Sequence, residues 1–312
     1  MGISHFIREI GRGKDGARSL DRAQAADLFG QLLDGAVTDL EVGAFCIAMR
    51  VKGETAEEMA GFLDATHARM NRVPAGAKPL VVLPSYNGAR KLPLLTPLLA
   101  LLAAREGFPV LIHGAQTEST RVFVTDVLRA MDMQAATCVR PIAAGEVLFV
   151  PTDALCSGLN RLLEVRRTVG LRNSSHSIVK LMNPCAGDAV IVGSYTHPEY
   201  AVSMAAVYEL MGSTAMLLRG TEGEPVADPR RMRRIDGFVR GERVELQDEQ
   251  QGSVTGLPDL PADISPASTA TYIQGVLSGN KPVPAPIARQ VEHILHLAQS
   301  QRTQQRPQEI TQ

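Results

Sequence analysis

The sequence lacks the cysteine patterns that mark metal-binding and disulfide-bonded proteins. Its cysteines are scattered, without CxxC or Cys/His spacing, at Cys46, Cys138, Cys156 and Cys185. This excludes a zinc ribbon or a disulfide framework and is typical of reduced, mostly buried thiols. His293 and His296 have no third ligand in the sequence, so no metal site is predicted there. We therefore expect a cytoplasmic protein.

A long hydrophobic run is also missing. The most apolar stretch, residues 92–104, is too short to span a bilayer and contains Pro93 and Pro97, so it is interpreted as a buried helix. Residues 1–16 carry charges in every short window and have no apolar core of signal-peptide length. We expect no membrane partner.

A strong net charge is the third absence. Lys and Arg number 32 and Asp and Glu number 33, giving −1 at neutral pH, which excludes a globally basic nucleic-acid binder. The basic residues are nevertheless concentrated in residues 230–243, where they outnumber the acids and give a local charge of +4. These are Arg230, Arg231, Arg233, Arg234, Arg240 and Arg243. Guanidinium groups along a loop and hairpin suit a phosphate backbone; the alternative is a solvated turn paired to acids such as Asp228 and Glu245.

The length and composition indicate a globular chain with two substructures, since 45% of its 312 residues are hydrophobic. Helical spacing and short connections predict an N-terminal helical domain over residues 1–72. Asp21 is a predicted helix start, Gly35 a predicted stop, and Thr55 with Glu58 a capping box. Helices near residues 156–185 are candidates to pack with this domain.

Residues 73–312 are predicted to form a doubly wound α/β domain, because short apolar runs alternate with helical segments. The strands are expected at residues 80–83, 110–112, 147–150, 189–192 and 215–218, and the helices at 120–131, 153–169 and 198–211. Residues 237–246 resemble a hairpin, and two further helices follow near residues 268–277 and 286–300. The last residues, RTQQRPQEITQ, are expected to form a loose tail.

The turn after the first predicted strand is a candidate ligand site, because open α/β sheets bind ligands at the carboxyl ends of their strands. Residues 85–91 read SYNGARK, with a single glycine beside Tyr86, Asn87, Arg90 and Lys91. One glycine does not build a phosphate cradle, whereas two cations and a ring suit contact with phosphates from outside. The alternative is a solvated turn with its tyrosine packed on the sheet.

Several motifs, in order along the chain, resemble those of anthranilate phosphoribosyltransferase and its relatives. Residues 38–55, TDLEVGAFCIAMRVKGET, resemble the amino-terminal signature of these enzymes. His113-Gly114, the arginine-rich stretch VRRTVGLRN at residues 165–173, and Asn183-Pro184 follow at matching places. The resemblance implies the nucleoside-phosphorylase-like, class III phosphoribosyltransferase fold.

Two departures from this family concern its chemistry. The enzymes carry Gly-Thr-Gly-Gly-Asp-Gly, the cradle for phosphoribosyl pyrophosphate, where this chain has residues 85–91. They also carry an adjacent Asp-Glu pair that helps to hold Mg²⁺, where this chain reads TEGEP at residues 221–225, leaving Glu222 and Glu224 as weak metal candidates. Because diphosphate chemistry depends on neutralising the leaving group, we expect no catalytic residues and no cofactor.

The loop at residues 85–91 and the basic run resemble the YbiB-type branch of the family, which implies sequence-independent DNA binding by a homodimer with a basic groove. DNA or RNA backbone is therefore the expected partner. Further phosphate-binding candidates are His113, Arg166, Arg172 and Lys180, although His113 at a strand end and Arg166 in a helix have equally good structural interpretations. The alternative function is an active phosphoribosyltransferase that uses phosphoribosyl pyrophosphate and Mg²⁺ on an aromatic or nitrogenous acceptor.

Overall fold

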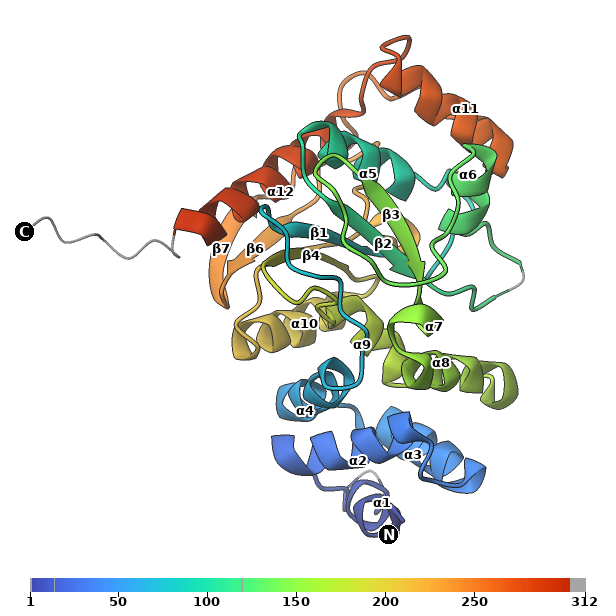
Figure 1. Cartoon of the computed structure of the whole chain (residues 1–312), viewed down its shortest axis with the longest axis vertical. Helices are drawn as coiled ribbons and strands as arrows, with labels where there is room; N and C mark the ends of the chain where they lie inside the picture. The colour runs from blue at the N-terminus through green and yellow to red at the C-terminus, as the bar shows by residue number, and fades with distance from the viewer. Residues whose placement is uncertain (1, 14, 119, 304–312) are drawn as a thin grey trace, which may run out of the picture.

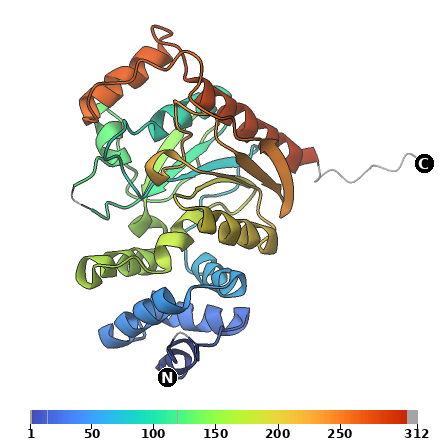
Figure 2. The ribbon, with the colours of Figure 1, turned by 180° about the vertical axis from the view of Figure 1, so that it is seen from behind.

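The computed structural model describes residues 2–13, 15–118 and 120–303, which form a helical part and a larger α/β part (Figures 1 and 2). The chain begins with α1 (Ser4–Ile10), α2 (Arg22–Asp34), α3 (Asp39–Lys52) and α4 (Ala56–His67). Capping boxes at Asp21, Thr38 and Thr55 start the last three of these helices, and Gly35 ends α2 in the left-handed conformation. Local sequence signals thus set the helix boundaries.

A mixed seven-stranded sheet forms the centre of the α/β part, with the order β3-β2-β1-β4-β5-β6-β7. Its strands are β1 (Leu80–Pro84), β2 (Val110–Gly114), β3 (Val147–Pro151), β4 (Ala189–Ser194), β5 (Ala215–Leu218), β6 (Ile235–Val239) and β7 (Glu242–Gln247). The first five strands are parallel, and the hairpin β6–β7 continues the sheet antiparallel to β5. A small helical domain followed by an α/β domain confirms the predicted fold class.

Both faces of the sheet are buried, because alternate residues of each strand enter different hydrophobic cores. One core contains Val81 and Leu83 and is covered by α5 (Thr96–Arg105), α6 (Val124–Ala130), α11 (Pro266–Leu277) and α12 (Ala285–Thr303). The other contains Leu80 and Val82 and is covered by α8 (Ser157–Val169), α9 (Ser175–Leu181) and α10 (Pro198–Leu210). Over the described residues, none of these helices combines the length and apolar character needed to cross a membrane.

Helices from the middle of the chain lie against the N-terminal helices (Figure 1). Helix α8 packs on α2, and α9 packs on α4. The approach of α8 is so close that a Cβ atom at Gly158 would lie 2.2 Å from the carbonyl oxygen of Leu33, so only glycine fits there. The helical part is therefore built from two separate segments of the chain, α1–α4 and α8–α9.

Three helix predictions have the wrong boundaries. The buried helix expected at residues 92–104 begins only at Thr96, and the other two are changed by contacts distant in sequence. The helix expected at residues 120–131 starts only at Val124, because Val122 exchanges backbone hydrogen bonds with Ala89 of 2.7 and 3.1 Å. The helix expected at residues 153–169 is split into α7 (Thr152–Leu155) and α8. Cys156 is extended between them, and the carbonyl oxygen of Leu155 accepts the N–H of Asn71 at 2.7 Å. In both places a contact distant in sequence replaces a helical hydrogen bond.

His67, at the end of α4, joins the helical part to the segment before β4. Its Nε2 accepts the backbone N–H of Asn183 at 3.0 Å, which requires an unprotonated Nε2. Burial lowers the pKa of His67 to about 4; the charge of Arg72 adds to this shift and that of Asp64 opposes it. The folded protein therefore holds this imidazole neutral at pH values where an exposed histidine is already charged.

We predict that His67 makes the protein less stable in acid. Its pKa of about 4 when folded lies below the ordinary 6.5, so between these values the unfolded chain binds more protons and stability falls as the pH falls. From pH 7 to pH 5 the free energy of unfolding should drop by roughly 1–2 kcal/mol on account of this residue. Urea unfolding of wild type and His67→Gln across this range measures the difference.

The exposed Val202 supplies the control, because Val202→Ala removes no titratable group and should reproduce the wild-type pH dependence. All other groups titrate alike in the compared proteins, so subtraction isolates His67. Identical pH curves for wild type and His67→Gln would contradict the assignment.

Candidate functional site

The direction of the chain through the sheet reverses between β1 and β4, and this reversal locates the candidate site. From β1 the chain passes through α5 to β2, whereas from β4 it passes through α10, on the other face, to β5. Open α/β sheets bind ligands at the carboxyl ends of strands beside such a reversal. Residues 85–91 follow β1 and residues 195–197 follow β4, so both segments lie at this edge.

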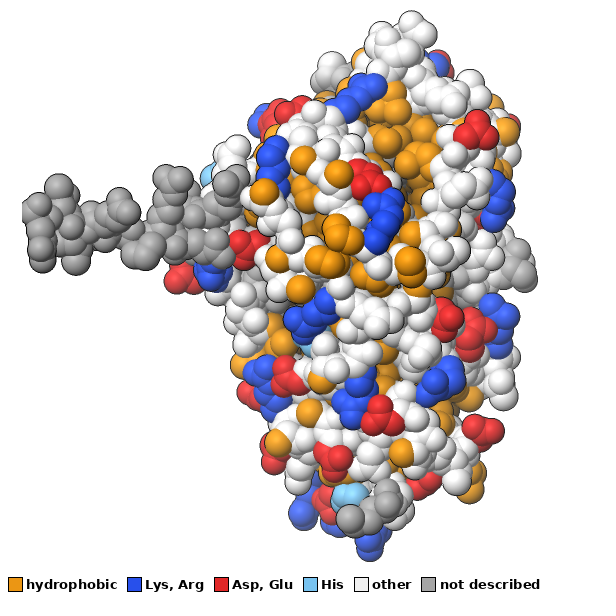
Figure 3. All heavy atoms as spheres, viewed as in Figure 1, with side chains coloured by type: hydrophobic (Ala, Val, Ile, Leu, Met, Phe, Trp, Pro, Cys, Tyr) orange, Lys and Arg blue, Asp and Glu red, His pale blue; other side chains and the backbone are white. Residues whose placement is uncertain are grey.

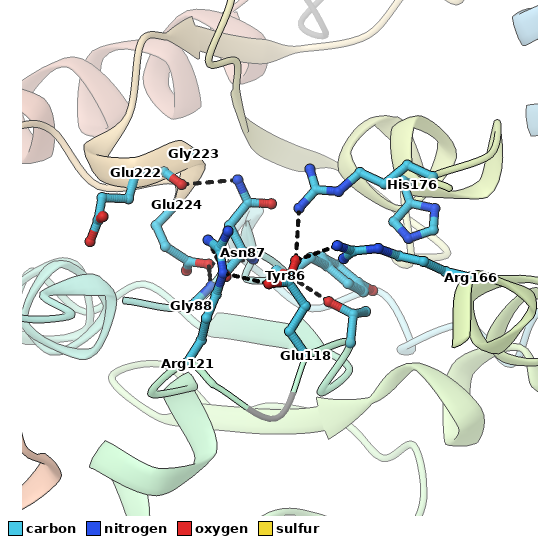
Figure 4. Close-up of polar contacts among 12 residues, drawn as sticks. Tyr86, Asn87, Gly88, Glu118, Arg121, Arg166, His176, Glu222, Gly223 and Glu224 are labelled. Carbon is cyan, nitrogen blue, oxygen red and sulfur yellow. Dashed lines mark hydrogen bonds and ion pairs between the residues drawn. The ribbon is translucent and has the colours of Figure 1, made fainter. Parts of the chain in front are cut away.

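Glu224 fills the loop that follows β1. Its side chain is fully buried, and its Oε1 accepts the backbone N–H groups of Asn87 and Gly88, each at 2.8 Å. Its Oε2 accepts the hydroxyl groups of Ser85 and Thr96, the latter at 3.1 Å. Figure 4 shows the carboxylate directed at Asn87 and Gly88. The loop is thus an anion site whose anion is part of the same chain.

Glu222 occupies the rest of the loop in the same way. Its Oε2 accepts the backbone N–H groups of Arg90, Lys91 and Leu92 at 2.9, 3.0 and 3.2 Å. Burial by itself would raise the pKa of Glu222, but these three donors outweigh it and hold the pKa below its usual range. Glu222 is therefore a carboxylate in the folded protein at neutral pH.

Residues 221–224, which we call the acidic turn, are held in place from several sides. The carbonyl oxygen of Gly223 accepts Lys180 Nζ at 2.9 Å and Ser194 Oγ at 2.7 Å, and that of Glu222 accepts Asn87 Nδ2 at 3.0 Å. A Cβ atom at Gly223, where φ is 85°, would lie 1.8 Å from Asn87 Nδ2. The position therefore requires glycine, and the turn is fixed on the loop.

The ammonium group of Lys180 forms its hydrogen bonds inside the protein. Besides Gly223, its ammonium group contacts the carbonyl oxygen of Ser194 at 3.3 Å. Burial lowers the pKa of Lys180 to about 8, although the nearby Glu224 favours the charged form. The sequence suggested a phosphate contact here; the structure gives the ammonium group two backbone carbonyls and a buried carboxylate instead.

Tyr86 and His113 also lie inside the protein. The Tyr86 hydroxyl group contacts His113 Nδ1 and Thr152 Oγ1, each at 2.8 Å. Burial raises the pKa of Tyr86 and lowers that of His113 to about 3, so both side chains are neutral near pH 7. The structure brings these two candidates together beneath the loop, where they hold its backbone against the sheet.

Three arginines surround one carboxylate at the same edge. Glu118 pairs with Arg166 at 2.6 Å, with Arg121 at 2.9 Å and with Arg172 at 3.8 Å. Arg121 also donates to the carbonyl oxygen of Asn87 at 3.0 Å, which ties the group to the β1 loop (Figure 4). Burial lowers the pKa of Arg172, and the charge of Arg166 lowers it further. This cluster, the Glu118 arginine cluster, has an excess of positive charge.

The arginines of residues 230–243 are mostly paired with acids. Arg230 pairs with Asp228 at 3.0 Å, and Arg233 pairs with Glu249. Arg234 and Arg243 share Asp236, at 2.9 and 3.2 Å. Within the described part of the chain, Arg231 and Arg240 form no ion pair. Asp228 was expected as a partner from the sequence, whereas Glu245 is not paired with these arginines.

The same arginines do not line a single groove. Residues 230–234 precede β6 at the carboxyl end of β5, the edge that carries the β1 loop, since Leu218 pairs with Ile235. Arg240 lies in the turn between β6 and β7 at the opposite edge, where its N–H donates to Thr214 Oγ1 at 3.1 Å. Antiparallel pairing of β6 therefore separates Arg240 from the rest.

Sequence reasoning missed three residues at the candidate site. Glu118 and Arg121 stand three apart in the loop after β2, and Arg219 directly follows β5. Their position after parallel strands was the signal that could have found them. With Arg219 included, this edge carries four exposed cations that form no ion pair with a described residue: Arg90, Lys91, Arg219 and Arg231.

Comparison with known proteins places the chain among relatives of one enzyme. Residues 4–70 match the helical bundle domain of a glycosyl transferase family. The Escherichia coli K12 protein YbiB, described as uncharacterized, is 39% identical over 291 residues, which cover 91% of this chain and 90% of that protein. Anthranilate phosphoribosyltransferase of Methylocella silvestris is 28% identical over 281 residues, covering 87% of this chain and 79% of the enzyme.

Solved structures show the same fold over nearly the whole chain. Anthranilate phosphoribosyltransferase from Thermus thermophilus superposes with a TM-score of 0.69 at 21% identity, covering 96% of this chain and 89% of the enzyme. The Saccharomyces cerevisiae enzyme in complex with PRPP and Mg gives a TM-score of 0.67 at 15% identity, with the same coverage. With its helical bundle, its sheet and its extended match to YbiB, the chain belongs to the anthranilate phosphoribosyltransferase-like family.

Proposed function

We propose that this protein binds nucleic acid through the phosphate backbone, independently of base sequence, at the carboxyl edge of its sheet. In this proposal it transfers no phosphoribosyl group and uses neither Mg²⁺ nor phosphoribosyl pyrophosphate. The observation that carries the proposal is the acidic turn, whose two carboxylates occupy the backbone donors of the β1 loop. An added diphosphate would have to displace Glu224, and the displaced carboxylate would remain beside it.

The acidic turn also argues against a metal-assisted transferase. Both carboxylate oxygens of Glu224 and one of Glu222 accept hydrogen bonds from the loop, so these groups are engaged as internal anions. Two carboxylates at a diphosphate position repel a diphosphate unless a metal ion intervenes. Glu222 and Glu224 are the residues that could bind such an ion, and both already accept hydrogen bonds from the loop.

The exposed cations at this edge supply the proposed binding surface. Arg90, Lys91, Arg219 and Arg231 come from the loops after β1 and β5 and are exposed. The Glu118 arginine cluster lies beside them and has more positive than negative charge. Because these groups come from loops at one edge of a sheet, they lie on the same side of the molecule, and a guanidinium donates to two phosphate oxygens at once.

On the face shown in Figure 3, Lys and Arg side chains are mixed with Asp and Glu over the helical half of the molecule. Such a surface attracts a polyanion weakly, because neighbouring charges of opposite sign cancel at a distance. The proposal therefore concerns the carboxyl edge of the sheet alone.

We predict salt-dependent binding to DNA of unrelated sequences. If about four to six phosphates are contacted, log affinity should fall against log salt with a slope of about −0.9 per contact on duplex DNA. The double variant Arg90→Ala/Lys91→Ala should weaken binding equally for every sequence and reduce the slope by about 2. Fluorescence anisotropy in 50–200 mM salt, roughly the range over which such contacts are lost, measures both quantities.

Arg289→Ala is the matched control, because Arg289 on α12 pairs with Glu292 at 2.6 Å and lies outside the proposed surface. It should leave affinity and slope unchanged. A flat salt titration of the wild type would refute the proposed function.

We predict that calorimetry with Mg²⁺ and phosphoribosyl pyrophosphate will detect no saturable binding. The physical reason is that Glu222 and Glu224 already occupy the donors of the β1 loop. An active anthranilate phosphoribosyltransferase titrated under identical conditions is the positive control. Tight, Mg²⁺-dependent binding to this protein would restore the transferase as its function.

We also propose that the protein is a homodimer joined through α3. One face of this helix carries Leu40, Ile47 and Val51, which are 84%, 42% and 62% exposed. Their spacing places them in one stripe, while Phe45 and Met49 on the other side are buried. A second copy is the proposed occupant because an apolar stripe on one helix can pack against itself around a two-fold axis.

The dimer prediction is tested by placing a charge in the stripe. Val51→Asp should convert a particle of twice 33.5 kDa into one of 33.5 kDa in light scattering, since an unpaired carboxylate is costly in an apolar interface. Val202→Asp changes a similarly exposed valine on α10, 74% exposed, and should leave the mass unchanged. A wild-type monomer at high concentration would contradict this part of the proposal.

A further inference from the structure

A cavity of about 610 Å³ opens beside the Glu118 arginine cluster. It lies between residues 49–54, which connect α3 to α4, and the segments around α9 and the start of α10. A shallower hollow over Asn87 and Glu118 shares Arg166, Arg172, Thr196 and His197 with it. The cavity is therefore continuous with the proposed nucleic-acid surface, and its volume lies within the range of small-molecule sites.

Two polar nitrogen atoms that line this cavity have no hydrogen-bond partner. Arg166 Nη1 is buried and has no partner among the described residues, although Nη2 of the same side chain reaches Glu118. His176 Nε2 is likewise buried without a partner. The other ring nitrogen, Nδ1, lies 3.3 Å from the N–H, the carbonyl oxygen and Oδ1 of Asn173. A buried donor without an acceptor is costly, and a phosphate oxygen would satisfy Arg166 Nη1.

Neutral His176 is expected at any pH near 7. Burial, reinforced by the charges of Arg172 and Arg166, lowers its pKa to about 3. Arg166, Arg172 and His176 line the same cavity, and the close-up shows Arg166 and His176 (Figure 4). The cavity thus offers an anion two guanidinium groups, and the carboxyl groups of Glu54 and Glu199 also line it.

The mouth of the cavity carries apolar and aromatic groups. Tyr200 on α10 is 38% exposed, and its ring centre lies 6.4 Å from that of His197. Leu171, after α8, is 47% exposed and lines the same cavity. Exposed rings beside phosphate-binding arginines are the groups on which unpaired bases stack in single-strand-binding proteins.

We propose that this cavity receives one unpaired nucleotide of a bound strand, with a phosphate on Arg166 and its base against Tyr200. The inference rests on the proposed function and adds a preference for single strands. A paired base cannot enter, because it would first have to leave its stack and its partner. The exposed cations contact the phosphate backbone of either polymer, and the cavity distinguishes a single strand from a duplex.

The test compares a short oligothymidylate with a blunt-ended duplex of equal length that has G·C pairs at both ends, by anisotropy at one salt concentration. The wild type should bind the single strand about tenfold more tightly or better, as expected when one base gains a stacking partner. Tyr200→Ala should remove about tenfold from single-strand affinity and leave duplex affinity unchanged. Tyr200→Phe, which keeps the ring, should behave like the wild type.

A mononucleotide separates recognition within a strand from capture of a free ligand. If thymidine monophosphate at low millimolar concentration displaces the duplex as well as the single strand, the cavity is a free-nucleotide site and the inference is wrong. Equal, salt-dependent affinity for both polymers would also overturn it while leaving the proposed function intact. Failure to bind either polymer would instead refute the proposed function itself.

Discussion

The carboxylate of Glu224 inside the β1 loop is the interaction on which the site depends. It accepts two backbone N–H groups and two hydroxyl groups in a buried position, and these donors come from the β1 loop and from Thr96 at the start of α5. A buried charge is tolerated only with such saturation, and the ammonium group of Lys180 nearby adds the opposite charge. Removing the carboxylate would leave several donors buried without acceptors.

This arrangement explains why a phosphoribosyltransferase fold can be kept without the phosphate cradle. The sheet reversal and the β1 loop remain, and the family's solved enzymes superpose over most of the chain. In this protein the acidic turn supplies the anion that the β1 loop binds. Because its carboxylates belong to the same chain as the loop, their effective concentration at the loop is very high. A loop occupied in this way is rigid, and it presents Arg90 and Lys91 outward because their N–H groups are bound to Glu222.

The charges divide accordingly into an internal and an external set. Lys180 donates to backbone carbonyl oxygens, and Glu222 and Glu224 accept backbone N–H groups within the protein. The Glu118 arginine cluster is intermediate, since one carboxylate serves three guanidinium groups and leaves Arg166 with an unused donor. Arg219 and Arg231 are exposed at the same edge. A polyanion would contact the external set. The internal set fixes the loops that carry the external set.

The sequence by itself determined the helix starts at Asp21 and Thr55, the five parallel strands and the hairpin, because capping and alternation are local properties. It also identified the β1 loop as a place where this chain departs from the family's sequence motif. Only the tertiary structure decided what replaces the cradle, since Glu224 meets Asn87 from 137 positions away. Likewise it decided which arginines are paired and that Arg240 lies at the far edge, because ion pairs and strand direction depend on residues brought together by folding.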